Sequence, residues 1–419
     1  MNATFSSFED LIAPVDPEEF LERYWEKDFL HLSRNRPGHF DGLFSLEDVD
    51  RWLASVRGGA ANTVALTDPA GSTEGRRDCR PEDIPIEQIY EAFAGGHSVI
   101  LNHVADWPPL AGLVEALARR FCAEIGVNLY LTPKGSRTFP VHTDDHDVFV
   151  LQVYGEKAWR LYEQRLVPVN RSHLRFRQEL AFTPEWGKAR LEGELLAEPT
   201  LKPGDVLYIP RGMPHCAVAK ETTSLHITVG VTPMFWLDFL QAAVEQAHVY
   251  APELRRTLPP GMIDDLDAVE TMRRDFEAAL KAFNEHCSFD EALRVVRWNR
   301  VRAQGFPADG HILQIDKLRD LDVESEVERR SGVLLTLDFW EDKFTNIRFG
   351  RKHIRAPFKL RRAAEFIRDH RRFRVAQIPG LDDKSRLVLV RRLIREGLLR
   401  FADGRPQIAE VPAAQRRSA

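Results

Sequence analysis

The stretch FPVHTDDHDVFVLQVYGEKAWRLY, Phe139–Tyr162, decides the fold of this chain. Within it, Asp147–Tyr154 is rich in β-branched and aromatic residues and predicts a strand. Gly155 and Glu156 predict a tight turn, and Lys157–Tyr162 predicts the returning strand. The sequence therefore indicates a β-hairpin that is preceded by a short polar segment.

That polar segment carries two side chains suited to bind a metal. His142 and Asp144 are two residues apart, and residues i and i+2 of an extended strand point to the same face. The third ligand is expected to be His215, which follows a short apolar strand and a sharp bend in LKPGDVLYIPRGMPHCAVA, Leu201–Ala219. Two histidines and one carboxylate leave open coordination positions, which is typical of non-haem Fe(II) oxygenases. The alternatives are a polar pair on a surface strand, and Cys216 as a fourth ligand, although Cys216 is expected to point to the opposite face.

The returning strand adds a buried cation to this pattern. Lys157 shares one face with Trp159 and Leu161 and is expected to point inward. An inward ammonium group is costly unless something negative meets it. We therefore expect a carboxylate of a bound cosubstrate to meet Lys157, about one hairpin away from the metal.

Two segments resemble a known family, NLYLTPKGSRTFPVHTDDHDVFVLQVYGEKAWRLY (Asn128–Tyr162) and PGDVLYIPRGMPHCAVA (Pro203–Ala219). They are similar to the JmjC-type cupin 2-oxoglutarate oxygenases, specifically the ribosomal oxygenase branch of protein arginyl and histidyl hydroxylases. The resemblance implies an α+β protein, a double-stranded β-helix (cupin/JmjC) with an added helical region and a C-terminal winged-helix domain. It also implies Fe(II), the cosubstrate 2-oxoglutarate and O2.

The same resemblance assigns roles to six residues. It places the catalytic metal triad on His142, Asp144 and His215. It places the basic residue that anchors the cosubstrate on Lys157, and two positions that line the cosubstrate pocket on Asn128 and Tyr130.

Four further histidines are weaker candidates. His97 and His103 have no carboxylate at a spacing that completes a triad, and we interpret them as ordinary residues. His146 lies four residues after His142 and, in a strand, shares its face, so it is a candidate to border the site or contact substrate. His226 lies in an alternating strand and is expected to pack in the sheet.

The chain is expected to divide into three parts. Residues 1–232 form the oxygenase domain with N-terminal helices, within which the Gly-, Ala- and Asp-rich segment 57–80 is expected to be a long loop. Residues 233–320 have helical periodicity, and the resemblance implies that this region forms a homodimer, with packing on its own barrel as the alternative. Residues 325–415 follow the outline helix, link, helix and strand of a winged-helix domain.

Charge is distributed unevenly along the chain. Residues 351–419 carry 19 Lys and Arg against 7 Asp and Glu, a formal charge of +12, whereas residues 1–350 carry 39 against 56, a charge of −17. Lys384, Arg391 and Arg395 are expected on the outer face of the last helix. This asymmetry favours a region that approaches RNA or a ribosome, and a solvated face used for protein contacts is the alternative.

Composition limits the class of protein. The chain has 419 residues, of which 43% are hydrophobic, and a net charge of −5, which is ordinary for a soluble protein. It has no apolar run of about 18 residues, as a membrane helix needs, and no secretory pattern at its N-terminus. The four cysteines form no CxxC pair and indicate free thiols in a reducing compartment. We therefore expect a cytoplasmic protein with no membrane contact.

These observations predict an Fe(II)- and 2-oxoglutarate-dependent dioxygenase that hydroxylates a protein side chain. As the resemblance implies, the substrate is expected to be Arg or His of a ribosomal protein. Alternatives with the same chemistry are a peptide-tailoring or RNA-modifying hydroxylase and a lysine demethylase. Outside the oxygenases, a metal-binding cupin isomerase or a non-catalytic binding protein could carry the same triad.

Overall fold

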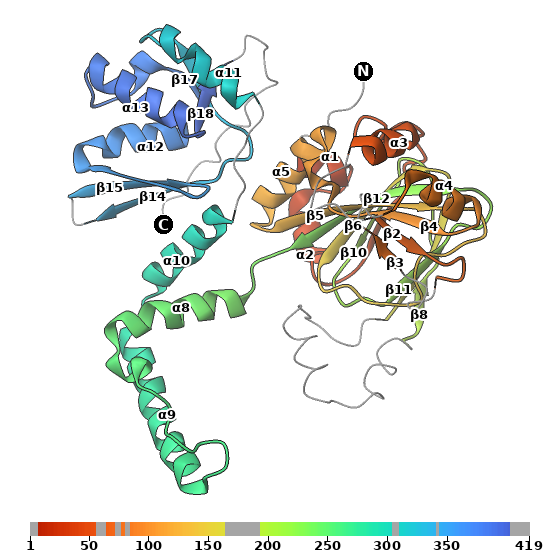
Figure 1. Cartoon of the computed structure of the whole chain (residues 1–419), viewed down its shortest axis with the longest axis horizontal. Helices are drawn as coiled ribbons and strands as arrows, with labels where there is room; N and C mark the ends of the chain where they lie inside the picture. Colours follow the sequence, from red (N-terminus) through yellow and green to blue (C-terminus); the bar gives the residue numbers. More distant parts are fainter. Residues whose placement is uncertain are drawn as a thin grey trace. The chain divides into compact units, whose positions relative to one another are not determined.

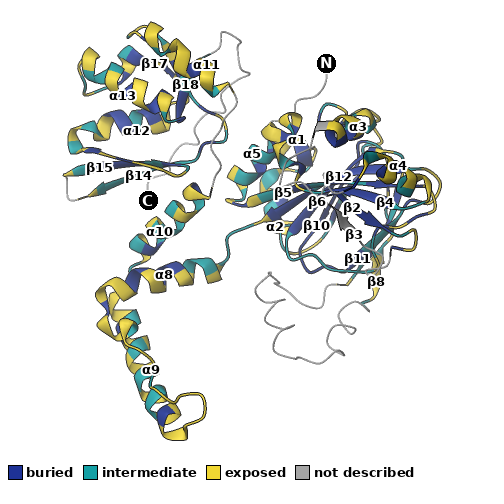
Figure 2. Cartoon of the chain, viewed as in Figure 1, coloured by how far each residue is buried: buried dark blue, intermediate teal, exposed yellow. Residues whose placement is uncertain are grey.

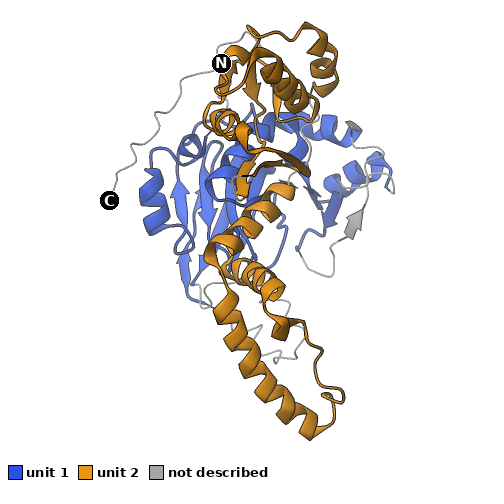
Figure 3. Cartoon of the chain, turned by 90° about the vertical axis from the view of Figure 1, so that its left-hand side faces the viewer, with its two compact units in different colours: residues 1–234 blue, residues 235–419 orange. Residues whose placement is uncertain are grey.

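The computed structural model divides the chain into two compact units, Met1–Met234 and Phe235–Ala419 (Figures 1 and 3). It describes residues 7–55, 64–71, 77–79, 84–163, 193–303, 310–340 and 343–402. Each unit has its own hydrophobic core.

Unit 1 begins with helices and strands that surround a central barrel. The elements before the barrel are α1 (Phe8–Ile12), α2 (Pro17–Arg23), β1 (Leu30–Leu32), α3 (Leu46–Ser55), β2 (Val64–Thr67), β3 (Arg77–Cys79), α4 (Ile86–Ala94), β4 (Ser98–Leu101), the short 3-10 turns η1 (Val104–Asp106) and η2 (Pro108–Leu110), and α5 (Ala111–Arg120). The barrel strands are β5 (Glu124–Thr132), β6 (Asp147–Tyr154), β7 (Lys157–Tyr162), β8 (Leu195–Ala197), β9 (Thr200–Leu201), β10 (Val206–Ile209), β11 (His215–Val218) and β12 (Ser224–Thr232).

These strands form two antiparallel sheets. The large sheet has the order β1-β10-β6-β12-β5-β4-β2-β3, and the small sheet has the order β11-β7-β8, with β9 also paired to β7. The two strands and the turn predicted at Asp147–Tyr162 are present as β6 and β7, but the prediction of a β-hairpin is wrong. The two strands do not pair with each other, because β6 pairs with β10 and β12 in the large sheet and β7 pairs with β11, β8 and β9 in the small one.

Side chains of the large sheet alternate between two apolar cores. On β6, Phe149 and Leu151 join the core that includes residues of the N-terminal helices, whereas Val148 and Val150 join a smaller core with Trp159 and Leu161 of β7. Each strand thus has one face toward the helices and one toward the barrel interior, because successive strand residues point to opposite faces. The polar residues of the interior face form the site described below.

The prediction of a long loop at residues 57–80 is wrong for part of the segment. It contains β2, which pairs with β4, and β3, which pairs with β2. The run Val64–Thr67 is completely buried, so its apolar residues extend the large sheet in spite of the surrounding Gly and Asp.

Unit 2 contains a helical part and a mixed part. The helical part comprises α8 (Trp236–Tyr250), η3 (Pro252–Arg255), α9 (Leu266–His286) and α10 (Phe289–Arg302). The mixed part comprises α11 (His311–Asp316), η4 (Lys317–Asp320), β13 (Glu326–Arg329), β14 (Leu335–Trp340), β15 (Phe344–Phe349), β16 (Lys352–Pro357), η5 (Phe358–Leu360), α12 (Arg361–Asp369), β17 (Arg372–Arg374), η6 (Val375–Gln377), α13 (Asp383–Arg395) and β18 (Leu399–Phe401).

The mixed part packs α12 and α13 on a core shared with two small antiparallel sheets, β17-β13-β18 and β14-β15-β16. The helical part is different, because α9 presents mostly exposed residues (Figure 2). Among the described residues, we find no helix with the length and apolar character needed to cross a membrane.

The turn between β6 and β7 requires glycine. Gly155 has φ +62°, and a Cβ atom there would lie 1.8 Å from the Thr223 carbonyl oxygen. Gly135 also has a positive φ, +79°, but a Cβ atom there would meet nothing within 4 Å. Glycine is therefore required at position 155 because a Cβ atom has no space there, whereas at position 135 only the backbone conformation favours glycine.

We expect Gly155→Ala to lower the free energy of unfolding by about 3 kcal/mol or more, because the backbone of the β11–β12 connection must move. Gly135→Ala is expected to cost only the backbone penalty of about 1–2 kcal/mol. Chemical denaturation of both variants tests this, and equal losses would mean that the close approach at Gly155 is not decisive.

Candidate metal centre

The structure brings His142, Asp144 and His215 together. Their ligand atoms all lie within 4.8 Å of one another, and in the described part of the chain this is the group of three side chains able to hold a metal. Nε2 of His215 is 3.5 Å from one Asp144 carboxylate oxygen, and Nε2 of His142 is 4.0 Å from the other. His142 and His215 are 73 positions apart in the sequence, so they come together only through the fold.

Backbone hydrogen bonds align the two ligand-bearing segments. The His142 N–H donates to the His215 carbonyl at 3.0 Å, and the His215 N–H donates to the His142 carbonyl at 2.8 Å. The Gly212 N–H donates to the Asp144 carbonyl at 2.9 Å. The bend before His215 is therefore paired directly with the segment that carries the other two ligands.

The same segments orient the imidazole rings. Nδ1 of His142 is 2.9 Å from the Pro140 carbonyl oxygen, and Nδ1 of His215 is 3.0 Å from the Met213 carbonyl oxygen. A carbonyl oxygen only accepts, so each Nδ1 carries the hydrogen and each Nε2 keeps its lone pair for a metal.

Electrostatics prepare the cluster for a cation. Burial and then the neighbouring His142 lower the pKa of His215, which is about 4 although the charge of Asp144 raises it. Burial raises the pKa of Asp144, but His215, His142 and His146 outweigh that effect, so the pKa lies below its usual value. Asp144 is thus a carboxylate and His215 a neutral ligand at neutral pH, which is the protonation state that metal binding requires. This donor set fits a divalent metal that prefers mixed nitrogen and oxygen ligands.

Lys157 is buried on β7, with a residue exposure of 2%, four residues before Leu161, which pairs with His215. Its Nζ atom donates to the hydroxyls of Thr132 at 3.0 Å and Thr138 at 3.3 Å. Among the described residues, no carboxylate pairs with it. Burial lowers the pKa of Lys157 to about 7, so the site holds a cationic group that lacks an anion.

Tyr130 and His226 form a wall next to Lys157. Their rings stack with centroids 4.9 Å apart and planes 4° apart, and Lys157 Nζ is 6.0 Å from the Tyr130 centroid. Burial, and then the charge of Lys157, lower the pKa of His226 well below its usual value. His226 was expected from the sequence only to pack in the sheet. Ser224, His226 and Thr228 are two residues apart from one another, so they lie on one face of the strand. Three polar residues on this face could have indicated that His226 points toward a polar interior.

Asn128 lies on the same face of β5, two residues before Tyr130. Its side-chain oxygen accepts from the His103 N–H at 3.1 Å, so it holds the chain at the start of η1. Neither His103 nor His97 joins the metal-binding group. Cys216 is also outside this group and pairs in register with Arg160 on β7.

A buried ion pair between Asp147 and Arg211 was not predicted from the sequence. Asp147 accepts from Tyr208 Oη at 2.7 Å and from Arg211 Nη1 at 2.8 Å, and both carboxylate and guanidinium are buried. Arg211 also pairs with Glu26 at 2.6 Å. Asp147 lies three residues after Asp144, and Arg211 lies four before His215, so the pair braces both ligand-bearing segments.

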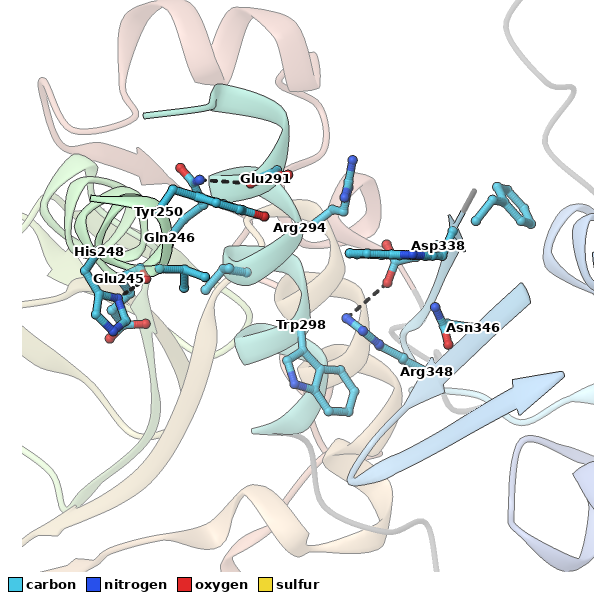
Figure 4. A pocket seen from close by; sticks show the side chains of 14 residues that line it. Glu245, Gln246, His248, Tyr250, Glu291, Arg294, Trp298, Asp338, Asn346 and Arg348 are labelled. Atoms are coloured by element: carbon cyan, nitrogen blue, oxygen red, sulfur yellow. Dashed lines mark hydrogen bonds and ion pairs between the residues drawn. The ribbon is translucent and has the colours of Figure 1, made fainter. Parts of the chain in front are cut away.

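Unit 2 contains a separate hollow of about 490 Å³ (Figure 4). Its polar groups are largely engaged with one another: Asp338 pairs with Arg348 at 3.0 Å, and Gln246 donates to Glu291 at 2.8 Å. The Arg348 guanidinium also stacks 4.9 Å from the Trp298 ring centroid. These contacts join α10 to β14 and β15 along one side of the hollow.

The buried Lys157 gives a pH-dependent prediction. Its pKa is about 7 in the folded chain and about 10.4 when exposed. Below pH 7 Lys157 is protonated in both the folded and the unfolded chain, so folding carries the full free-energy cost of burying the charge. This cost falls as the pH rises from 7 to about 10, because the folded chain then buries a neutral amine. We expect Lys157→Met to stabilise the fold by about 2–4 kcal/mol at pH 6 and by much less at pH 9.5.

Denaturation at both pH values tests this prediction, with Lys281→Met as the control because Lys281 is exposed on α9. A stabilisation that is equal at the two pH values would contradict the depressed pKa of Lys157.

Removal of one ligand should strongly weaken metal binding but preserve the fold. We expect Asp144→Ala to weaken Co(II) or Fe(II) binding by about a hundredfold or more, since it removes the only anionic ligand of the group. Asp145→Ala is the neighbouring control. Anaerobic calorimetry measures the affinity and circular dichroism the fold, and metal binding by Asp144→Ala at the affinity of the unaltered chain would rule out this centre.

Comparison with known proteins agrees with this geometry. Residues 103–239 match the JmjC domain family. Human Ribosomal oxygenase 1 is 34% identical over 279 residues, which cover 64% of this chain and 42% of the human protein. The Bifunctional lysine-specific demethylase and histidyl-hydroxylase NO66 of Drosophila willistoni is 34% identical over 259 residues, 59% of this chain and 32% of that protein. The chain spans about a third to a half of the length of these curated relatives.

Solved structures share the fold over most of the chain. The Escherichia coli ribosomal oxygenase YcfD, in complex with cobalt and 2-oxoglutarate, aligns with a TM-score of 0.54 at 18% identity, covering 93% of this chain and 99% of YcfD. A further X-ray structure of E. coli ycfD aligns with a TM-score of 0.56, also at 18% identity, over 93% of this chain and 98% of that one. The expected JmjC-type cupin architecture is thus confirmed. Residues 103–239 thus resemble the JmjC domain, and the chain is similar in sequence to Ribosomal oxygenase 1 and in fold to the solved E. coli structures.

Proposed function

We propose that this protein is an Fe(II)- and 2-oxoglutarate-dependent dioxygenase that hydroxylates an Arg or His side chain of a ribosomal protein. The observation that carries the proposal is that unit 1 holds both a two-histidine, one-carboxylate group and a buried lysine, Lys157, that pairs with no carboxylate among the described residues. A metal-binding cupin with another activity needs the triad but has no need for Lys157. The names of the relatives, ribosomal oxygenase and histidyl-hydroxylase, support the substrate class.

Each residue has a defined part in this proposal. His142, Asp144 and His215 would hold Fe(II) through two Nε2 atoms and a carboxylate. Bound Fe(II), with 2-oxoglutarate and O2, supplies the oxidising chemistry that inserts oxygen into a C–H bond. Lys157 binds the far carboxylate of 2-oxoglutarate, with Thr132 and Thr138 orienting its ammonium group.

The remaining pocket residues shape the space around the cosubstrate. Tyr130, stacked on His226, gives the interior a flat wall next to Lys157. Asn128 borders the same space and ties it to η1. The apolar interior core, which includes Val150, excludes water from the opposite side.

Two assays separate the remaining candidate functions. Release of succinate from 2-oxoglutarate identifies a dioxygenase and excludes an isomerase or binding protein. Mass spectrometry of ribosomal proteins then distinguishes a gain of one oxygen from the loss of a methyl group, which would indicate lysine demethylation, the activity in the name of the NO66 relatives. A gain of oxygen on a peptide or an RNA base would indicate the tailoring or RNA-modifying alternatives.

A homodimer is the proposed assembly. Large apolar side chains of the helical part of unit 2 are exposed, including Trp236 at 75%, Leu240 at 53% and Phe276 at 59%. Apolar surface on this scale is typical of protein interfaces. A second copy of the chain would cover it and provide the dimer that the family resemblance implies.

The C-terminal part is proposed to be a winged-helix module that lies near RNA when the enzyme meets its substrate. Its order of α12, β17, α13 and β18, with β17 and β18 on either side of β13, supports that architecture. Lys384, Arg391 and Arg395 of α13 are exposed, and such groups attract phosphates.

Loss of the Lys157 charge should weaken cosubstrate capture. We expect Lys157→Ala to raise the 2-oxoglutarate concentration needed for half-maximal succinate release at least tenfold, because a charge-assisted hydrogen bond contributes about 1.5–3 kcal/mol. Lys157→Arg should be affected less, since the charge remains. An unchanged titration for Lys157→Ala would mean that another group binds the carboxylate.

Neutralising α13 should change the salt dependence of RNA binding. Replacement of Lys384, Arg391 and Arg395 by Gln is expected to reduce the slope of log affinity against log salt for ribosomal RNA by about 2, since each phosphate contact contributes about 0.7–0.9. The control replaces Arg273, Arg274 and Lys281, three exposed cations of α9. Equal slopes for both triple variants would leave α13 without an electrostatic part in binding.

A further inference from the structure

One side of the small sheet β14-β15-β16 points away from the core of unit 2. On β14, Leu335 and Leu337 pack against that core, so the alternate residues Asp338 and Trp340 point to the opposite side. Aromatic, polar and charged residues share this opposite side by strand register: Asp338, Trp340, Phe344, Asn346, Arg348, His353 and Arg355. The sheet therefore has an apolar side toward the core and a side that carries rings and cations.

The hollow of about 490 Å³ in unit 2 lies against this side of the sheet (Figure 4). Its other walls come from the end of α8, which contributes Tyr250, and from α10, which contributes Arg294 and Trp298. Tyr250 and Trp340 are half exposed, at 52% and 51%, so two aromatic rings are open to a ligand that enters. A hollow of this size with aromatic walls and a few polar groups is typical of sites that bind small planar groups.

The charges that line the hollow favour an anionic ligand. Asp338 is neutralised by its ion pair, and Glu291 accepts the hydrogen bond described above. Glu245 is exposed at the α8 end of the hollow, away from Trp298 (Figure 4). Arg294, in contrast, forms no ion pair or hydrogen bond among the described residues. An unpaired guanidinium next to aromatic rings fits a ligand that is both planar and negatively charged.

Asn346 adds a hydrogen-bond donor to the hollow. This residue is only 8% exposed, and its Oδ1 atom accepts from His353 Nε2 at 2.9 Å. Its Nδ2 group donates to no residue in the described part of the chain. A nearly buried amide with an unused donor is costly, and a ring nitrogen or carbonyl oxygen of a nucleobase would accept from it.

Cationic groups continue from the hollow across the sheet. The Arg355 guanidinium lies 3.6 Å from the ring centroid of Phe344, on the neighbouring strand, and Arg355 remains exposed. Trp340 is opposite Phe344 in the register, so a ligand chain that leaves the hollow meets Arg355 within two strand spacings, roughly 10 Å. Residues 351–419 together carry a charge of +12, which favours a polyanion.

We propose that the hollow and the adjoining side of the sheet bind single-stranded RNA. One base stacks on Trp340 and Tyr250 and accepts a hydrogen bond from Asn346, while Arg294 and Arg355 bind the neighbouring phosphates. This inference goes beyond the contact proposed for α13, which attracts phosphates but reads no base. The choice of RNA over DNA rests on the proposed function, whereas the recognition of an unpaired base does not.

Other ligands fit these groups less well. A duplex keeps its bases paired and stacked, so it cannot place a base in the hollow. A basic peptide would bring its positive charge to the unpaired Arg294. Successive bases of a single strand, in contrast, commonly stack on aromatic side chains while cations bind the backbone.

The test measures binding of the full-length chain to a fluorescent single-stranded RNA of about twelve nucleotides, with the duplex of the same sequence as a second probe. We expect Trp340→Ala and Tyr250→Ala each to raise the Kd for the single strand about tenfold, the loss expected for one base–aromatic stack. The Kd for the duplex should change by less than about twofold. Trp340→Phe, which keeps a ring, should recover most of the affinity.

Tyr154→Ala is the matched control, because Tyr154 is exposed to a similar extent, 49%, on β6 of unit 1. It should keep the Kd of the unaltered chain. Circular dichroism of all variants should be unchanged, since the rings of Tyr250 and Trp340 are half exposed and their removal opens no core.

Salt separates stacking from charge. Arg294→Gln combined with Arg355→Gln should reduce the slope of log affinity against log salt by about 1.4, since each phosphate contact of a single strand contributes about 0.7. Trp340→Ala should leave this slope unchanged. In a chain that also carries the three α13 substitutions, Trp340→Ala should still weaken binding about tenfold, which distinguishes the hollow from α13.

Several outcomes would overturn the inference. Unchanged affinity of Trp340→Ala and Tyr250→Ala, or equal losses for single strand and duplex, would exclude base recognition by the hollow. Tighter binding of the same sequence as DNA would exclude the choice of RNA. A loss of affinity that coincides with a change of oligomeric state in light scattering would assign the hollow to a second copy of the chain.

The failure of this inference differs from failure of the proposed function. Absence of any binding of single-stranded RNA by the unaltered chain overturns both the hollow and the RNA contact of α13. Succinate release is measured without RNA, so the oxygenase proposal is decided by that separate measurement.

Discussion

Two backbone hydrogen bonds between His142 and His215 are the constraint on which the site depends. They join residues that are far apart in the chain, and they bring a loop before β6 to the first residue of β11. The metal-binding group can form only where these segments meet in this register. The buried Asp147–Arg211 ion pair lies behind the same junction, so removal of either partner would leave an uncompensated charge beside the ligands.

The barrel interior is divided between apolar and polar residues. Val148, Val150 and Leu161 provide a dry core, while Lys157, His226 and the triad lie in the remaining space. Burial shifts the pKa values of these polar groups in directions that favour neutral imidazoles and a poorly charged lysine. The apolar core between the large sheet and the N-terminal helices stabilises unit 1. This stabilisation offsets the destabilising effect of the polar groups that are buried in the barrel interior.

Local sequence patterns predicted much of this arrangement. The strands β6 and β7 and the turn at Gly155 follow from the local sequence, although the pairing of these two strands as a hairpin does not occur. The spacing of His142 and Asp144 indicated a shared face. Periodicity predicted helices in residues 233–320, where α8, α9 and α10 lie. Each of these features depends on residues close together in the chain.

The remaining contacts depend on strand register between distant segments. The stack of Tyr130 on His226 requires β5 and β12 to pair with these two residues opposite each other. The ring of His146 fits beside β12 only because Gly230 has no side chain there. Likewise, β2 was missed because Val64–Thr67 is too short to predict a strand until β4 offers an edge for pairing.

The buried ammonium group of Lys157 has a consequence for how the site binds its ligand. With a pKa of about 7, this lysine is only partly protonated in the ligand-free protein near neutrality. An anion that pairs with it favours the protonated form, so binding draws a proton from the solvent at slightly alkaline pH. Capture of a dicarboxylate is then a coupled uptake of anion and proton, and its apparent affinity follows the acidity of the surroundings as well as the concentration of the ligand.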